Sequence, residues 1–195
     1  GMDFTGIEIR QEQVDFNTSR VQEYGLSARY ICDDGQNVLD HIEESSQDLL
    51  FSCPPYYDLE HYSDLPNDAS NQETYEDFYK IIEKAFSDSI KCLKDDRFAV
   101  IVVGDVRDKK GAYYDFISDV KDIFIRNGMC LYNEIILINS VGTASLRAGN
   151  YMRNRKVTKV HQNVLVFYKG DISHIGMKFG DVEVLVDDSE NEQVE

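Results

Sequence analysis

The chain has 195 residues, of which 42% are hydrophobic, a length that supports one sizeable α/β core and is short for two. No apolar run is long enough to cross a membrane and the polar N-terminus has no signal-peptide character, so we expect a cytoplasmic protein without a membrane partner. The formal net charge of −16 argues against a polyanionic partner, because phosphate contacts supply most nucleic-acid affinity.

The hydrophobic pattern predicts strands that alternate with helices. Strands are expected at 3–9, 28–32, 48–52, 98–103, 131–138 and 164–168, and helices at 11–24, 37–42, 74–93 and 113–126. Such alternation is typical of a mostly parallel sheet with helices on both faces. Ligands bind these sheets at the carboxyl ends of the strands, which is where we expect the functional site.

Acidic side chains follow several of the expected strands. Glu8 ends the first strand and is placed to bind the two hydroxyls of a ribose, while Asp34 follows the second and is placed to accept a proton from an adenine amino group. Asp105 follows the strand at 98–103. Each acid alone is more typical of a turn residue or a helix cap than of a ligand site, and their shared edge is what shifts the balance toward a nucleotide site.

The strand at 48–52 runs directly into two prolines and two aromatic rings. Ser52, Cys53, Pro54, Pro55 and Tyr56 form this turn, in which the prolines fix the backbone and remove two donors. Carbonyl acceptors beside a ring suit a flat substrate with an amino group, such as a nucleobase. An ordinary strand end with a Pro-rich loop is the alternative.

Basic residues gather between positions 145 and 161, a segment without a single acid. They are Arg147, Arg153, Arg155, Lys156 and Lys159, which we expect in a loop that contacts a nucleic-acid backbone, with a solvated face as the alternative. Seven acids lie in the last fifteen residues, so we expect residues 171–195 to be an acidic, partly disordered extension. The cysteines are scattered without a C-x-x-C pair, which argues against a zinc site and a disulfide framework, and we expect no metal.

Three motifs in order, at residues 5–13, 51–56 and 159–170, resemble those of the amino-directed DNA methyltransferases that use S-adenosylmethionine, and the likeness is greatest to versions found in phage and mobile elements. The resemblance covers residues 3–170. It implies a Rossmann-like class I methyltransferase domain that transfers a methyl group to the exocyclic amino group of a flipped adenine or cytosine. It places the base at residues 52–56 and the cofactor at Glu8, Asp34 and Ser52.

The chain departs from this family at two points. Cys53 stands where the family usually has Asp, Asn or Ser, so acceptance of the amino protons would rest on backbone carbonyls, aided by Ser52. No Gly-rich cofactor loop precedes residue 3, so we expect the first strand of the sheet to be missing. We therefore expect this chain alone to bind S-adenosylmethionine weakly or not at all, with self-association or an upstream segment that supplies the strand.

Other functions stay open at this point. A Pro-Pro-aromatic turn also serves methylation of RNA bases or of a protein glutamine, and only the basic segment favours nucleic acid here. A non-catalytic remnant that binds DNA or a protein partner is a further alternative. A Rossmann-type oxidoreductase is disfavoured, because no G-x-G-x-x-G follows any strand.

Overall fold

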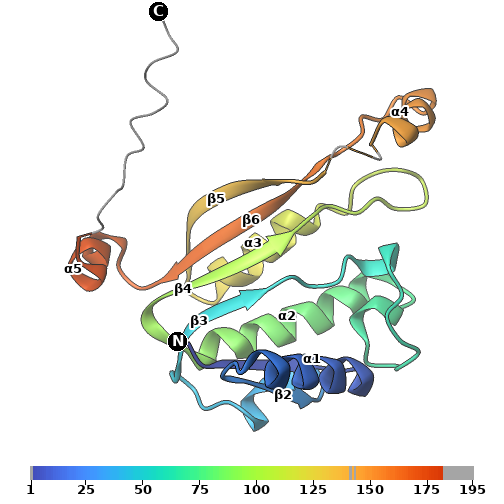
Figure 1. The fold of residues 1–195 in the computed structure, drawn as a ribbon. Helices are drawn as coiled ribbons and strands as arrows, with labels where there is room; N and C mark the ends of the chain where they lie inside the picture. Colours follow the sequence, from blue (N-terminus) through green and yellow to red (C-terminus); the bar gives the residue numbers. More distant parts are fainter. Residues whose placement is uncertain (1, 141, 143, 182–195) are drawn as a thin grey trace, which may run out of the picture.

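A computed structural model describes residues 2–140, 142 and 144–181, and most of the acidic tail lies outside the described residues (Figure 1). The strands are β1 (Phe4–Glu8), β2 (Ala28–Cys32), β3 (Gln47–Ser52), β4 (Leu93–Val103), β5 (Cys130–Ile138) and β6 (His161–Lys169). The helices are α1 (Gln11–Tyr24), α2 (Tyr75–Cys92), α3 (Phe116–Arg126), α4 (Ala144–Arg153) and α5 (Ile175–Phe179). Short 3-10 turns are η1 (Gly35–Asp40), η2 (Tyr57–Leu59), η3 (Ala69–Asn71) and η5 (Ile172–His174).

The strands form two separate sheets. β1 and β2 make a parallel pair, and four strands follow in the order β3-β4-β6-β5. β3 and β4 are parallel, whereas β6 runs antiparallel to both of its neighbours. The larger sheet is therefore mixed, with β3, β4 and β5 running in one direction and β6 reversed. β5 and β6 are the arms of one long hairpin, paired from Cys130 and Tyr168 to Ile138 and His161, so β6 must return in the opposite direction.

The core fills one face of the four-stranded sheet. Alternate residues of β4, Ala99, Ile101 and Val103, are fully buried against α2 and α3. Phe78 from α2 and Phe116 from α3 are equally buried and contact each other, with ring centroids 5.1 Å apart. Alternate residues of the strand thus pack against the apolar faces of the helices, as the sequence pattern predicts.

The opposite face of this sheet is largely open. Leu49 and Phe51 of β3 are 51% and 60% exposed there. Among the described residues, α5 reaches this face at one corner, where Phe179 packs on Phe98 at 5.2 Å between ring centroids. The expectation of helices on both faces is thus wrong for the larger sheet, because α1 packs on β2 of the small sheet instead.

The small sheet is attached through η1, which packs on α2. β1 and β3 do not pair with each other, and the described residues place no strand between them. Both strands nevertheless deliver their carboxyl ends to the same cavity, which Glu8 and Ser52 line. Within the described part of the chain, no helix has the length and apolar character needed to cross a membrane.

Two local expectations need correction. The helix at 37–42 is the 3-10 turn η1, which is kinked at Asn37 and begins earlier because Asp34 caps it by accepting a hydrogen bond from Gln36 N. The basic segment contains helix α4 rather than a loop alone. Residues 172–179, at the start of the expected extension, form η5 and α5, where Phe179 has an aromatic partner on the sheet.

Candidate active site

The turn at residues 52–56 leaves β3 at the carboxyl edge of the sheet. Pro54 and Pro55 lack a backbone N–H, so they end the strand after Ser52. Tyr57, which follows, has a φ of +50°, a strained value for a residue with a bulky side chain. Its buried ring packs against Tyr75, Phe78 and Tyr114, and its hydroxyl donates to the Glu73 carbonyl at 3.0 Å. This aromatic anchor fixes the direction of the turn.

Tyr56 is held on several sides. Gln162 of β6 donates from Nε2 to the Tyr56 hydroxyl at 2.7 Å, and Phe116 packs edge-on against the ring. The ring of Tyr56 also packs against Gly104. A Cβ atom added to Gly104 would lie 3.3 Å from Cε2 of Tyr56, which is closer than ordinary van der Waals contact. Burial raises the pKa of the Tyr56 phenol well above its usual value, with the nearby Cys53 thiol adding to the effect. The side chain is therefore a neutral, oriented ring.

A cavity of about 580 Å³ opens beside Tyr56. Its lining includes the turn from Cys53 to Tyr56 and, from the neighbouring strands, Asp105 after β4 and Gln162 of β6. We call it the turn-side cavity. Oδ1 of Asp105 is buried and has no hydrogen-bond partner among the described residues. Burying a hydrogen-bond acceptor without a donor costs free energy of folding unless a ligand supplies the donor. Oδ1 of Asp105 is therefore suited to accept a hydrogen bond from an N–H or O–H group of a ligand in this cavity.

A second cavity, of about 340 Å³, lies on the other side of the turn and is lined by all three residues expected to bind a cofactor, Glu8, Asp34 and Ser52. Glu8 Oε1 accepts from the Arg10 backbone N–H at 3.0 Å. Asp34 accepts from Gln36 N at 2.9 Å. We call it the acid-side cavity. Residues 53–55 line both cavities, so the turn is their common wall.

The loop between the turn and α2 touches both cavities. Tyr62 lines each of them, and the Arg10 guanidinium lies 5.5 Å from the centroid of its ring. Further along the loop, Asn67 donates from Nδ2 to Asp34 Oδ2 at 2.9 Å. Tyr62 donates its hydroxyl proton to Glu60, which raises the pKa of this phenol to about 12. The loop is thus attached to the acid-side cavity by a polar and a cation–π contact.

The basic segment sits at the tip of the β5–β6 hairpin, beyond the carboxyl edge of the sheet (Figure 1). Arg147 on α4 and Lys159 before β6 line the turn-side cavity. Arg153, Arg155 and Lys156 lie between them in sequence but are not part of the lining. The structure therefore brings the ends of the basic segment to the predicted base-binding turn, although the two are far apart in the chain.

Two residues of the site escape sequence reasoning. Gln162 stands at the start of a strand, and only the pairing of β6 with β4 brings it to Tyr56. Arg107 belongs to no expected element, yet it lines the turn-side cavity with its guanidinium 3.7 Å from the ring centroid of Tyr113. Asp105 is recognisable in the sequence as an acid after a strand, but its lack of a partner is visible only in the fold.

Solved structures with a similar architecture include S-adenosylmethionine-dependent methyltransferases. A candidate DNA modification methylase from Thermus thermophilus matches with a TM-score of 0.53 at 20% identity, over 84% of this chain and 59% of that protein. The same protein complexed with S-adenosyl-L-methionine matches with a TM-score of 0.53 at 17% identity, over 100% and 63%. A SAM-dependent methyltransferase from Methanosarcina mazei matches with a TM-score of 0.51 at 13% identity, over 85% and 81%.

The fold is thus that of the class I methyltransferases, a Rossmann-like α/β architecture with a mixed sheet. The chain itself belongs to the DNA methylase family of the N6/N4 type, whose pattern it matches over residues 47–194. No curated protein sequence matches it. The chain spans about three fifths of the length of the Thermus methylase.

Proposed function

We propose that this chain is the catalytic region of a methyltransferase that moves a methyl group from S-adenosylmethionine to the exocyclic amino group of adenine or cytosine in DNA. The observation that carries the proposal is the turn at 52–56, whose residues 53–55 form the common wall of two cavities. One cavity has the carboxylates suited to a nucleoside, and the other has an aromatic ring and an acceptor without a partner among the described residues. Family membership supports the same reaction.

The residues of the acid-side cavity fit the adenosine part of the cofactor. Glu8 and Asp34 offer carboxylate oxygens for ribose hydroxyls and an adenine amino group, and Ile7, Ile81 and Ile82 offer apolar surface. When bound, S-adenosylmethionine supplies an activated methyl group on its sulfonium. Glu8, Asp34 and Ser52 are the residues that would hold it beside the turn.

The turn-side cavity acts on the base. An exocyclic amine is a weak nucleophile, because its lone pair is delocalised into the ring. Carbonyl oxygens near Cys53 and Pro54 accept hydrogen bonds from its N–H groups, which draws the nitrogen toward a tetrahedral geometry and frees the lone pair. After the methyl group is transferred from the sulfonium, the nitrogen releases one proton to solvent. Tyr56 stacks on the flipped base, and Arg147 and Lys159 at the rim meet the DNA backbone.

Methyl transfer to duplex DNA tests the proposal. Because the sequence predicts weak cofactor binding, the chain is incubated with a large excess of S-adenosylmethionine and with DNA of mixed sequence. The digested nucleosides are analysed by mass spectrometry for N6-methyladenine and N4-methylcytosine. We expect one of the two, and we expect Tyr56→Ala to lower its yield severalfold or more while Tyr24→Ala, at an exposed position of α1, leaves it unchanged. Methylation of RNA or of a glutamine peptide in place of DNA would overturn the substrate assignment. DNA binding without any transfer would favour a non-catalytic role.

A further inference from the structure

The cations of this molecule fall into two groups. Ten of the twenty Lys and Arg side chains form ion pairs with described carboxylates. Of the other ten, only Arg20 and Arg29 lie in the N-terminal part of the chain. The rest lie in two segments, as Arg107, Lys109 and Lys110 in one and the five residues of the basic segment in the other. In a chain with 36 acids, eight cations at one end have no carboxylate partner within the described residues.

Residues 107–113 form a small, well-braced hairpin after β4. Arg107 pairs with Tyr113, and Asp108 N donates to the Ala112 carbonyl at 2.8 Å. The Asp108 carboxylate is used inside the hairpin, where it accepts from Ala112 N at 2.8 Å. Arg107 donates from Nη1 to the Gly111 carbonyl at 2.7 Å. Lys109 and Lys110 are left exposed at the tip.

This hairpin touches the basic segment. A Cβ atom added to Gly111 would collide with Nζ of Lys156, so the two segments are in contact although they are far apart in the sequence. Figure 1 shows the loop after β4 curling beside α4. The turn-side cavity lies between them, lined by Arg107 and Tyr113 on one side and by Arg147 and Tyr151 on the other.

Like charges brought together repel one another, and the cost is recovered when a polyanion binds between them. Although the chain has 36 acids, Lys109, Lys110 and Lys156 form no ion pair with a carboxylate in the described structure. The one carboxylate of the hairpin, that of Asp108, instead accepts a hydrogen bond from the backbone N–H of Ala112. A braced pair of basic walls around an aromatic cavity fits a nucleic-acid strand whose phosphates lie on the walls while one base enters the cavity.

We propose that the hairpin at 107–113 and the basic segment are the two walls of one groove, which holds the DNA backbone on both sides of the nucleotide whose base enters the turn-side cavity. The inference rests on the proposed function and extends it, since it assigns DNA contacts to Lys109 and Lys110, outside the basic segment. Arg107, fixed by its ring and carbonyl contacts, forms the inner edge of this wall.

The salt dependence of DNA binding tests the second wall. Binding of the 195-residue chain to a fluorescein-labelled duplex of about 30 base pairs is measured by anisotropy at several salt concentrations. Lys109→Ala/Lys110→Ala should reduce the slope of log affinity against log salt by about 1.8, because each lost phosphate contact on duplex DNA contributes about 0.9. At about 0.1 M salt this corresponds to a loss of affinity of roughly tenfold or more.

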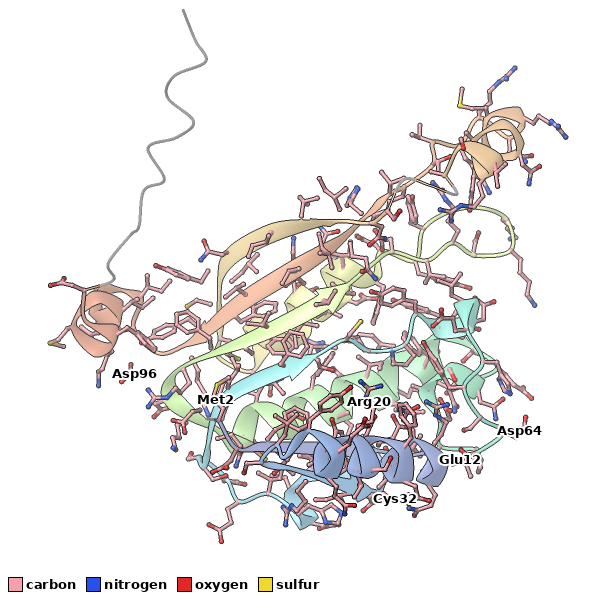
Figure 2. The ribbon with its side chains drawn as sticks, in the orientation of Figure 1. Met2, Glu12, Arg20, Cys32, Asp64 and Asp96 are labelled. Atoms are coloured by element: carbon pink, nitrogen blue, oxygen red, sulfur yellow. The ribbon has the colours of Figure 1, made fainter. Side chains whose placement is uncertain are left out.

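A matched control separates local contacts from overall charge. Arg20→Ala/Arg29→Ala also removes two positive charges and breaks no ion pair in the described structure. Arg20 on α1 lies well away from α4 in Figure 2. This variant should keep the wild-type slope. Lys109→Arg/Lys110→Arg should also keep it, which shows that charge at the tip is what matters. Thermal unfolding of each variant verifies that the fold is retained.

The outcomes distinguish the inference from the function on which it rests. The first outcome is a steep salt dependence in the wild type with an equally small change of slope in Lys109→Ala/Lys110→Ala and in Arg20→Ala/Arg29→Ala. It would overturn the assignment of DNA contacts to the hairpin and leave the proposed DNA methylation unaffected. Absence of wild-type binding to duplex DNA would overturn both. Tighter binding to an RNA hairpin of similar length than to the duplex would overturn the assignment of the groove to DNA.

Discussion

At the scale of single residues, Tyr56 has two separable features, its ring and its hydroxyl. Tyr56→Ala removes the surface on which the base stacks and should weaken base engagement by about 1–3 kcal/mol. Tyr56→Phe keeps the ring but leaves Gln162 Nε2 without its acceptor, which should cost about 1 kcal/mol of folding free energy and little base affinity. Binding to DNA with a mismatched target base, together with thermal unfolding, measures both quantities. Equal base affinity in wild type and Tyr56→Ala would remove the stacking role.

Gly104 controls the place of the same ring. In Gly104→Ala the new methyl group would lie 3.3 Å from Cε2 and 3.6 Å from Cζ of Tyr56, so the ring must move by a few tenths of an ångström. Because Phe116 and Gln162 restrict that movement, we expect methyl transfer to fall severalfold with a small loss of thermal stability. Gly128→Ala, where nothing lies within 4 Å but φ is +82°, is the control, since it strains the backbone and leaves the site untouched. If Gly128→Ala lowers activity as much as Gly104→Ala does, the effect is not local.

Asp105 should show opposite effects on stability and on activity. Its Oδ1 is buried without a partner in the described structure, so the neutral, nearly isosteric Asp105→Asn should stabilise the fold by roughly 1 kcal/mol. The same change replaces one of the acceptor oxygens of the turn-side cavity by an amide nitrogen, which donates, and we expect DNA methylation to fall. Denaturant unfolding and methyl transfer measured on one preparation decide the matter. Asp108→Asn, whose carboxylate caps the hairpin, should lose stability and thus move in the opposite direction.

At the scale of elements, what the sequence predicts depends on whether the signal is local. The apolar period of residues 11–24 and the Gly25 at its end predict α1, which ends there with Gly25 in the left-handed conformation. Glu8, Asp34 and Ser52 can be grouped from strand ends alone, and the fold brings them to one cavity. The antiparallel course of β6 cannot be read in this way, because a strand carries the same pattern in either direction. Gln162 at Tyr56 depends on that course and escapes prediction for the same reason.

The contact between α2 and α3 includes a carboxyl group that resists ionisation. Tyr75 donates its hydroxyl proton to Asp119 at 2.5 Å. Burial nevertheless raises the pKa of Asp119 above its usual value, and the neighbouring Asp115 and Asp122 add to the effect. A raised pKa means that the folded state favours the protonated form, so this stability is present below the unfolded-state pKa of about 4 and is lost as pH rises through the folded-state value.

Asp119→Asn should therefore be more stable than the wild type at about pH 7, since the amide oxygen still accepts from Tyr75 and carries no charge. The advantage should shrink as pH is lowered below about 4, where both side chains are neutral. Thermal unfolding midpoints between about pH 3 and pH 8 give this difference directly. Asp122→Asn, exposed on the same helix, should give a smaller change. An advantage that stays constant across this pH range would show that ionisation of Asp119 is not its cause.

At the scale of the whole molecule, paired and unpaired cations of the described structure lie in different places. Most of the paired cations lie on α2, α3 and β4, as in the ion pairs of Lys84 and Lys91 with Asp88. Cations without carboxylate partners in the described structure collect at the carboxyl edge, around the turn-side cavity. The net charge of −16 is therefore a poor guide to partners, because the cations of residues 107–110 and of the basic segment gather at this edge, beside Asp58, Glu60 and Asp105 of the cavity lining.

The two-sheet organisation predicts unequal local stability. β4 and β6 lie inside the four-stranded sheet over the main core, whereas β1 pairs on one side with β2 and is not paired with β3. Since η1 packed on α2 is the principal attachment of the small sheet, opening this unit should cost less free energy than global unfolding. Native-state hydrogen exchange should show amides of β1 and β2 exchanging at least roughly tenfold faster than those of β4 and β6.

Adding S-adenosylmethionine should slow exchange in β1 and η1, whose ends carry Glu8 and Asp34, and leave β6 unchanged. Uniform exchange across both sheets would show that they open as one unit, and protection confined to β6 would remove the cofactor from the acid-side cavity.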